Sequence, residues 1–302
     1  MSTLLIHHHD LDGYLAGDIT LLHHPDAIPM SLNYDDPAAI PGLEALAAHS
    51  LVIVVDYSLP PETMLQLFRE NRLLWIDHHV SSIRNSQAHG YDQAPGLRIT
   101  RTDNPPCGAE LAWEFFEHTP VPRLLRLTGD FDTYRNSHAP EFQTDVLPFF
   151  YGTQLVFERL RPANFHQPDF LLPDAAHYQN DAWCDELIHN GRLIQAYNRK
   201  YYAGLLRESA FVRQIWGLRV LCFNCAGHGS SNMQPAFNPA LHDAMLLYSF
   251  NGKRWSYGLY TDDQAKPDLD LSRIANQYGG GGHRSACGFS TTALLPELLA
   301  DE

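Results

Sequence analysis

Residues 4–17, with the sequence LLIHHHDLDGYLAG, carry the pattern from which the fold can be predicted. Residues 4–6 form a short apolar run, which is typical of a buried strand. Three histidines and two aspartates follow at once, and Gly13 then allows a tight backbone turn. Residues 14–22 continue as a predicted helix. The stretch therefore predicts a strand, a polar turn and a helix.

Alternate positions of this stretch carry possible metal ligands. Successive side chains of an extended strand point to opposite faces, so His8, Asp10 and Asp12 are expected on one side. His7 and His9 are expected on the other side. Carboxylates suit Mg²⁺ and Mn²⁺, and an added imidazole favours Mn²⁺, Fe²⁺ or Zn²⁺. An ordinary polar loop is the alternative, whereas a tag remnant is disfavoured because the histidines lie inside a strand-to-helix junction.

Two further apolar runs also end in acidic or imidazole side chains. The runs cover residues 51–55 and 73–76, and the side chains that follow them are Asp56, Asp77, His78 and His79. A predicted helix separates the two runs, and strands that alternate with helices indicate a parallel sheet. Ligands of such sheets bind at the carboxyl ends of the strands. We therefore predict an α/β fold in which the three polar clusters converge in one cleft.

The composition narrows the class of protein. The chain has 302 residues, enough for two domains, and a formal net charge of −14. Long nucleic acids are gripped by basic surfaces, so this charge disfavours them without excluding a short nucleotide. The sequence shows no apolar run long enough to span a membrane and no pattern of a signal peptide. It predicts a cytoplasmic protein that does not bind membranes.

The cysteines do not form a recognisable framework. They are Cys107, Cys184, Cys222, Cys225 and Cys287, an odd and scattered set that argues against structural disulfides. The spacing of Cys222 and Cys225 matches redox and zinc motifs, but a second pair is missing and the first lies in a predicted strand. We interpret this pair as structural rather than as a metal or redox site.

Helical patterns follow the predicted sheet. Residues 107–116 form an apolar stripe, and residues 123–127 form a second helix that leads into a polar loop with Asp130 and Asp132. One of these carboxylates can cap a local turn, and the other is a candidate ligand. Residues 140–168 also look helical, and we interpret their aromatic side chains as core rather than as a stacking platform.

The second half of the chain predicts a separate small domain. A long helix over residues 181–206 leads to four predicted strands, two of them joined by Asn251 and Gly252, a strong hairpin signal. A helix and the glycine-rich residues 279–288 follow. Consecutive glycines let the backbone approach a ligand, and their amides can form an anion nest. His283 and Arg284 beside them could bind phosphate.

Taken together, these motifs resemble the DHH phosphoesterase family, which is named after its Asp-His-His triplet. The shared pattern comprises His8-x-Asp10-x-Asp12-Gly13, Asp56, Asp77-His78-His79 and Asp132-Thr133. The glycine-rich stretch is similar to the signature of the DHH-associated C-terminal domain. The resemblance implies a parallel-sheet catalytic domain with helices on both faces over residues 1–180. It further implies a connecting helix over residues 181–208 and a smaller α/β substrate-binding domain over residues 209–302.

The resemblance also implies a centre of two divalent cations. Mn²⁺ is expected, with Mg²⁺ or Co²⁺ as alternatives. One cation would be held by His8, Asp10 and Asp56, and the other by Asp12, Asp56, His78 and Asp132. Asp130 is a rival of Asp132. His79 would act beside the scissile phosphate, and Asp77 would support the histidines. The substrate would be gripped by Gly280, Gly281, Gly282, His283 and Arg284.

The implied activity is the hydrolysis of short oligoribonucleotides, or of linear dinucleotides such as pGpG, to mononucleotides. A water activated by two metal ions would attack the phosphorus. A cyclic-dinucleotide phosphodiesterase or a 3′-phosphoadenosine 5′-phosphate phosphatase would need the same centre. A non-catalytic nucleotide sensor is a more remote alternative, which predicts the loss of a ligand. The expected partner is a short nucleotide, and the chain could form a homodimer.

Overall fold

The computed structural model describes residues 2–34, 39–97, 105–157, 175–224, 236–262 and 264–299. The chain divides into two compact units, Met1–Gln195 and Ala196–Glu302. Several predicted features lie outside the described residues: the breakers at 35–37, 104 and 173–174, the possible strand at 98–100, part of the helical stretch 140–168, and Cys225.

The first unit contains a four-stranded sheet. Its strands are β1 (Ser2–His8), β2 (Ile28–Leu32), β3 (His49–Val55) and β4 (Leu73–Ile76). They lie in the order β2-β1-β3-β4, and every neighbouring pair is parallel. The predicted parallel sheet is thus confirmed, although β3 begins at His49 instead of residue 51.

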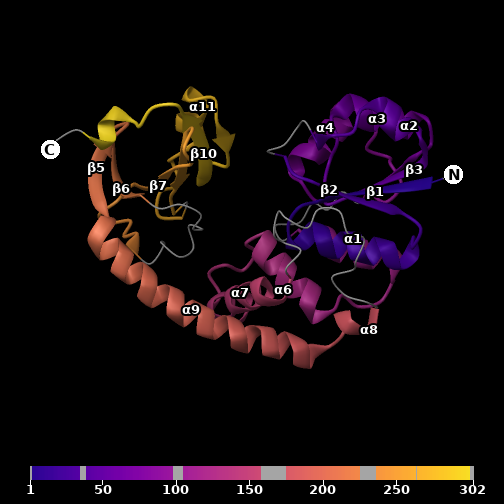
Figure 1. Cartoon of the computed structure of the whole chain (residues 1–302), viewed down its shortest axis with the longest axis horizontal. Coiled ribbons are helices and arrows are strands. Elements are labelled where there is room, and N and C mark those ends of the chain that lie inside the picture. Colours follow the sequence, from indigo (N-terminus) through magenta and orange to yellow (C-terminus); the bar gives the residue numbers. More distant parts are fainter. Residues whose placement is uncertain are drawn as a thin grey trace. The chain divides into compact units, whose positions relative to one another are not determined.

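Helices cover both faces of this sheet (Figure 1). The helices of one face are α1 (Leu11–His23), α5 (Gly108–Phe116) and α6 (Arg123–Asp132); those of the other are α2 (Leu43–Ala47), α3 (Pro61–Arg69) and α4 (Val80–His89). Alternate strand residues serve the two cores, with Leu5 in one and Leu4 and Ile6 in the other. The continuous apolar runs of the sequence reflect this burial on both faces.

The strand order places a ligand site at one edge of the sheet. The chain moves from β1 outward to β2 and then crosses to β3 on the other side of β1. Open α/β sheets bind ligands outside the carboxyl ends of their strands, at the point where the direction of winding reverses. His8 ends β1, and Asp56 directly follows β3. Both side chains therefore lie at this switch point.

A helical layer completes the first unit. It comprises the π-helix η2 (Phe142–Val146), α7 (Leu147–Val156), α8 (Ala175–Tyr178) and the first part of α9 (Asp181–Ser209). The described part of the predicted helix over residues 140–168 is thus helical up to Val156, with a π-helical segment at Phe142–Val146. Phe149 is fully buried, and the ring of Phe150 stacks on Phe131 at 3.6 Å, as expected for core aromatics.

The second unit is a six-stranded mixed sheet. Its strands, in spatial order, are β5 (Phe211–Ile215), β6 (Leu218–Asn224), β7 (Ala244–Phe250), β8 (Trp255–Tyr260), β10 (Ala286–Thr291) and β9 (Gly281–Gly282). Of the strand pairs in the described part of this unit, only β6 and β7 are parallel, and β7 and β8 form the predicted hairpin. Helix α11 (Ser272–Gln277) and the short 3₁₀ helix η6 (Pro296–Leu298) pack on one face, and the end of α9 packs on the other.

Two features of the described chain bear on the remaining predictions. Cys222 is fully buried in the core of the second unit, which agrees with a structural role. Among the described residues, none of the helices is both long enough and apolar enough to cross a bilayer.

Candidate metal centre

The aspartates of the first motif project from a helix start and not from a strand. β1 ends at His8 and α1 begins at Leu11, so the alternation argument was wrong for Asp10 and Asp12. Asp10 is the N-cap of α1 and accepts a hydrogen bond from the Gly13 amide at 2.9 Å. A Cβ at Gly13 would lie 2.4 Å from the His8 carbonyl oxygen, so this helical position requires glycine.

The neighbouring histidines are turned to other partners. His7 is buried, its Nδ1 lies 2.9 Å from the His8 carbonyl oxygen, and burial lowers its pKa to about 4. His9 Nδ1 lies 3.1 Å from Ser31 Oγ and 2.9 Å from the Tyr14 hydroxyl. The ligand groups found in the described part of the chain include His8 but neither of its neighbours.

The predicted ligands gather into three overlapping groups. In each group, one donor atom from every residue lies within 4.8 Å of the others. The groups are His8 with Asp10 and Asp56, Asp12 with His78 and Asp132, and Asp56 with His78 and His79. The structure therefore brings together side chains from the ends of β1, β3 and β4 and from α1 and α6, and these groups can hold metal.

Asp56 presents its two oxygens to different groups. Its Oδ2 atom lies 3.9 Å from His8 Nδ1, which in turn lies 2.8 Å from Asp10 Oδ2. Its Oδ1 atom lies 3.2 Å from His78 Nε2 and 3.9 Å from His79 Nδ1. The backbone of Asp56 is left-handed, with φ of 51°, a conformation that non-glycine residues adopt mainly where the surroundings impose it.

The start of helix α5 holds Asp12 in place. The amides of Gly108 and Ala109 donate hydrogen bonds of 2.7 and 2.8 Å to its two carboxylate oxygens. The first amides of a helix have no partners within the helix, so two amides of α5 are satisfied by the Asp12 carboxylate and fix its orientation. His78 Nε2 lies 3.7 Å from Asp12 Oδ2 and 3.5 Å from Asp132 Oδ2.

We expect Gly108→Ala to disturb the centre. A Cβ at Gly108 would lie 2.5 Å from Asp56 Cβ, so either Asp56 or the start of α5 has to move. Overpacking of this kind typically costs about 1–3 kcal/mol. Urea unfolding should show this loss, and Mn²⁺ titration should show weakened binding. Gly204→Ala is the control, since nothing lies within 4 Å of the position of the added Cβ atom. If Gly108→Ala showed unaltered stability and unaltered Mn²⁺ binding, the prediction would be contradicted.

Asp77, the first residue of the Asp-His-His triplet, orients the two histidines that follow it. This fully buried residue accepts hydrogen bonds through Oδ1 from the amides of His78 and His79, at 2.8 and 3.1 Å. The same oxygen lies 2.7 Å from His79 Nδ1. Burial lowers the pKa of His79, but the hydrogen bond to Asp77 and the nearby carboxylates outweigh it and raise the pKa to about 9.

The carboxylates of the centre repel one another. Burial and the charges of Asp12 and Asp10 raise the pKa of Asp56 well above its ordinary value. The same causes raise the pKa of Asp132 to about 8. The Oδ1 atom of Asp56 is buried without a hydrogen-bond partner. Carboxylate and imidazole donors of this kind suit Mn²⁺ and similar divalent cations, so the residues fit such ions.

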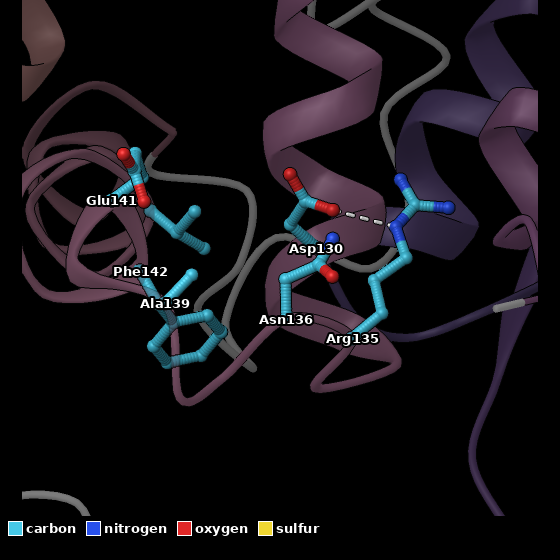
Figure 2. Close-up of a pocket in the computed structure, with 7 residues that line it drawn as sticks. Asp130, Arg135, Asn136, Ala139, Glu141 and Phe142 are labelled. Carbon is cyan, nitrogen blue, oxygen red and sulfur yellow. Dashed lines mark hydrogen bonds and ion pairs between the residues drawn. The ribbon is translucent and has the colours of Figure 1, made fainter.

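Asp130 and Asp132 point to different surroundings. Helix α6 extends to Asp132, so the prediction of a loop after residue 127 was wrong, and both aspartates lie in the last helical turn. Asp132 belongs to the group with Asp12 and His78. Asp130 instead pairs with Arg135 at 2.6 Å, at the wall of a separate cavity of about 250 Å³ (Figure 2).

Arg135 joins the ends of α5 and α6. Its guanidinium donates two hydrogen bonds of 2.7 Å to the two carboxylate oxygens of Glu110, and another to Asp130. Glu110 also accepts the Cys107 amide at 3.0 Å and so caps the start of α5. The side chains of Arg135 and Glu110 are only 10% and 6% exposed. This buried pair therefore connects the helix that carries Asp132 with the helix that holds Asp12.

We expect Arg135→Met to destabilise the first unit strongly. The change leaves the Glu110 carboxylate buried without its cation, which typically costs about 3–5 kcal/mol. The double variant Arg135→Met with Glu110→Gln should recover much of this loss, because no buried charge then lacks a partner. Urea unfolding of both variants is the measurement, and equal destabilisation of the two would contradict the role of the ion pair.

The glycine-rich stretch of the second unit is used mainly for close packing. Gly281–Gly282 forms β9, and a Cβ at Gly280 would lie 2.1 Å from the Gly288 carbonyl oxygen. The amides of Gly279, Gly280 and His283 donate to backbone carbonyls. Because these amides already have partners, they do not form the free anion nest that the glycine run suggested.

The two basic residues beside the glycines lie at the surface. Both His283 and Arg284 are exposed. The guanidinium of Arg284 donates to the carbonyl oxygens of Pro267 and Leu269. Part of its hydrogen-bonding capacity is therefore used within the unit.

Comparisons with known proteins add little to this geometry. No family model matches the sequence. An uncharacterized protein of Acanthamoeba polyphaga mimivirus is 24% identical over 257 residues, which cover 80% of this chain and 53% of that protein. The chain thus spans about half the length of the curated relative that it matches.

Three solved structures are similar to this chain in part. RecJ from Thermus thermophilus in complex with Mn²⁺ has a TM-score of 0.49 and 16% identity, covering 96% of this chain and 49% of that chain. The pGpG-specific phosphodiesterase PggH from Vibrio cholerae has a TM-score of 0.47 and 12% identity, covering 97% and 94%. An exopolyphosphatase-related protein from Bacteroides fragilis has a TM-score of 0.46 and 12% identity, covering 98% and 88%. TM-scores below 0.5 do not assign an activity to the chain.

Several residues around the centre were not anticipated from the sequence. They are Tyr34, Tyr57, Gly108, Glu110 and Arg135, which contact the predicted ligands or hold the elements that carry them. Only Gly108 and Glu110 carried a local signal, as the N1 and N3 positions after a helix breaker. The two tyrosines lie in segments that otherwise read as ordinary strand ends.

Proposed function

We propose that the chain is a metal-dependent phosphodiesterase of the DHH type. Its substrates are short oligoribonucleotides or linear dinucleotides such as pGpG, which it hydrolyses to mononucleotides. The observation that supports this most is the position of Asp56 at the switch point of the parallel sheet, with one oxygen toward His8 and the other toward His78. A carboxylate so placed can serve two cations at once.

The proposed ligand sets follow the two sides of Asp56. One cation would be held by His8, Asp10 and Asp56, and the other by Asp12, Asp56, His78 and Asp132. Divalent ions at these sites, with Mn²⁺ as the first choice, would supply Lewis acidity to the phosphoryl group and would lower the pKa of a water. The amides of α5 hold the Asp12 carboxylate in position.

His79 acts on the substrate in this proposal. Asp77 occupies its Nδ1 atom, so Nε2 is the nitrogen left to donate a hydrogen bond to a phosphoryl oxygen. An imidazole N–H placed there stabilises the negative charge that grows on the phosphoryl group during attack. Asp77 thus fixes both the orientation and the tautomer of the ring, as a carboxylate commonly does for a catalytic histidine.

We further propose that the second unit acts as a substrate-binding domain. The catalytic domain would span residues 1–180, the connecting helix 181–208 and the binding domain 209–302. Gly280, Gly281, Gly282, His283 and Arg284 would contact the part of the substrate remote from the reacting phosphate. His283 and Arg284 are the better candidates within this set, because they are exposed and basic.

A length series tests this proposal directly. Purified protein with Mn²⁺ is mixed with RNA of two to about twenty nucleotides, with a cyclic dinucleotide and with 3′-phosphoadenosine 5′-phosphate. We expect the fastest turnover on the shortest linear RNA, and equal rates at every length would refute the short-substrate claim. Faster turnover of the cyclic dinucleotide or of the phosphoadenosine would replace it with that activity. Nucleotide binding without any hydrolysis would indicate a sensor.

A further inference from the structure

Two stacked tyrosines lie beside the metal centre. Tyr34 follows β2, and Tyr57 directly follows Asp56. Their ring centroids are 4.5 Å apart with an interplanar angle of 25°. Tyr57 is fully buried, whereas Tyr34 is 47% exposed. The buried Tyr57 ring therefore supports the ring of Tyr34, and about half of the Tyr34 surface remains accessible to a ligand.

The ring of Tyr34 lies near histidines from two of the three ligand groups. Its centroid lies 5.3 Å from the ring of His8 and 5.9 Å from the ring of His79. His8 belongs to one ligand group, and His79 to another. A planar group stacked on Tyr34 would thus lie next to the phosphate on which the centre acts.

The backbone nearby holds the pair in place. The Ser58 amide donates a hydrogen bond of 3.1 Å to the Tyr34 hydroxyl. Trp75 Nε1 donates one of 3.0 Å to the backbone carbonyl oxygen of Tyr57, whose ring is held by its complete burial. Since both rings are already fixed, a ligand that stacks on Tyr34 orders little of the protein when it binds. A large exposed aromatic side chain that is fixed in this way is suited to recognition.

We propose that Tyr34 stacks on the nucleobase attached to the phosphate that the centre binds, an inference that rests on the proposed function. The substrate class is then nucleotides, and polyphosphates or sugar phosphates without a base are poor ligands. Each base has a π-face, so stacking favours nucleotides while tolerating different base sequences. The exposed ring thereby determines which phosphate compounds the centre accepts.

Equilibrium binding tests this role without requiring turnover. Guanosine 5′-monophosphate and ribose 5-phosphate are titrated into the full chain loaded with Mn²⁺, and affinities are measured by calorimetry. The variants are Tyr34→Leu, which lacks the aromatic face, and Tyr34→Phe, which keeps it. Tyr197→Leu is the matched control, since Tyr197 is a 66% exposed tyrosine on α9 that belongs to none of the ligand groups.

The wild type should bind guanosine 5′-monophosphate more tightly than ribose 5-phosphate, by roughly 5- to 150-fold. Tyr34→Leu should lose most of this preference and leave the affinity for ribose 5-phosphate unaltered, while Tyr34→Phe should retain it. Equal affinities in the wild type, or an equal loss for both ligands in Tyr34→Leu, would overturn the inference. If the wild type shows the preference but hydrolyses no dinucleotide, the proposed activity fails and the stacking site stands.

In the enzyme assay, the same variants show whether Tyr34 binds the base of the substrate or only supports the fold around the centre. Against a dinucleotide, Tyr34→Leu should raise KM by about tenfold or more with a smaller change in kcat. Against a dinucleotide that lacks the base beside the cleaved phosphate, wild type and variant should have the same KM. A fall in kcat on both substrates would show that the ring only supports the fold of the centre.

Discussion

Replacing Asp56 by asparagine should lower the Mn²⁺-dependent hydrolysis of a linear dinucleotide by roughly 100- to 1,000-fold or more. Asparagine keeps the shape of the side chain but loses one anionic oxygen and the charge. Because the two oxygens of Asp56 face His8 and His78, the substitution removes this ligand from one proposed ion site and leaves only a neutral amide oxygen for the other. Steady-state turnover with saturating Mn²⁺ is the measurement.

The same variant should remain folded and become more stable without metal. Asn is among the few residues that tolerate the left-handed backbone, so the φ of 51° at this position is preserved. The pKa of Asp56 is raised by burial and by Asp12, which means that its ionised form destabilises the metal-free fold. Each kcal/mol recovered by neutralising it should raise Tm by about 2–4 °C.

A surface substitution of the same kind serves as the control. Asp185→Asn removes a carboxylate that is 67% exposed and paired with Arg123, far along the chain from the ligands. It should leave both turnover and the metal-free Tm close to those of the wild type. Undiminished turnover by Asp56→Asn, measured beside this control, would rule out a bridging role for Asp56.

Adding Mn²⁺ should raise the melting temperature of the wild type markedly. A ligand at 100 times its Kd stabilises the folded state by about 2.7 kcal/mol, which corresponds to a rise of about 5–10 °C for a unit of this size. Asp56→Asn should show little of this rise. Scanning calorimetry with and without a chelator measures it, and a wild type that is indifferent to Mn²⁺, Mg²⁺ and Co²⁺ alike would contradict the metal centre.

The pH dependence of the metal-free protein follows from Asp132. Burial and Asp12 raise its pKa to about 8, above the value of about 3.9 in an unfolded chain, so the folded state binds more protons between these values. This contribution to stability is present at low pH and is lost as the pH rises through about 8. The metal-free Tm should therefore fall between about pH 5.5 and pH 8.5, and Mn²⁺ should stabilise the protein more at the higher pH.

Much of the site could be predicted because it follows strand ends. Continuous apolar runs revealed the strands, and acidic or imidazole groups directly after them marked one edge of the sheet. The strand alternation used for Asp10 and Asp12 was wrong, since the helix begins as soon as the strand has ended. Both aspartates reach the centre through helical geometry, which periodicity over so few residues cannot distinguish from a strand.

The remaining features depend on contacts that are distant in sequence. Nothing local to Tyr34 predicts that it stacks on Tyr57 next to His8, because the sheet alone brings their segments together. The choice between Asp130 and Asp132 depended on the partner Arg135, which a single helical turn does not reveal. In the glycine-rich stretch, composition indicated close backbone approach correctly, but the approach is to β10.

The hydrogen bonds between Asp12 and the start of α5 join residues that are 96 and 97 positions apart. The proposed donors extend further still, from His8 to Asp132. During synthesis, a nascent chain emerging from the ribosome therefore displays its first carboxylates long before the segments that organise them exist. Closing so long a loop costs conformational entropy, which is offset only by the contacts of the completed unit. The cations would therefore bind late, after the chain of the catalytic domain has left the exit tunnel. They would not act as a template for its folding.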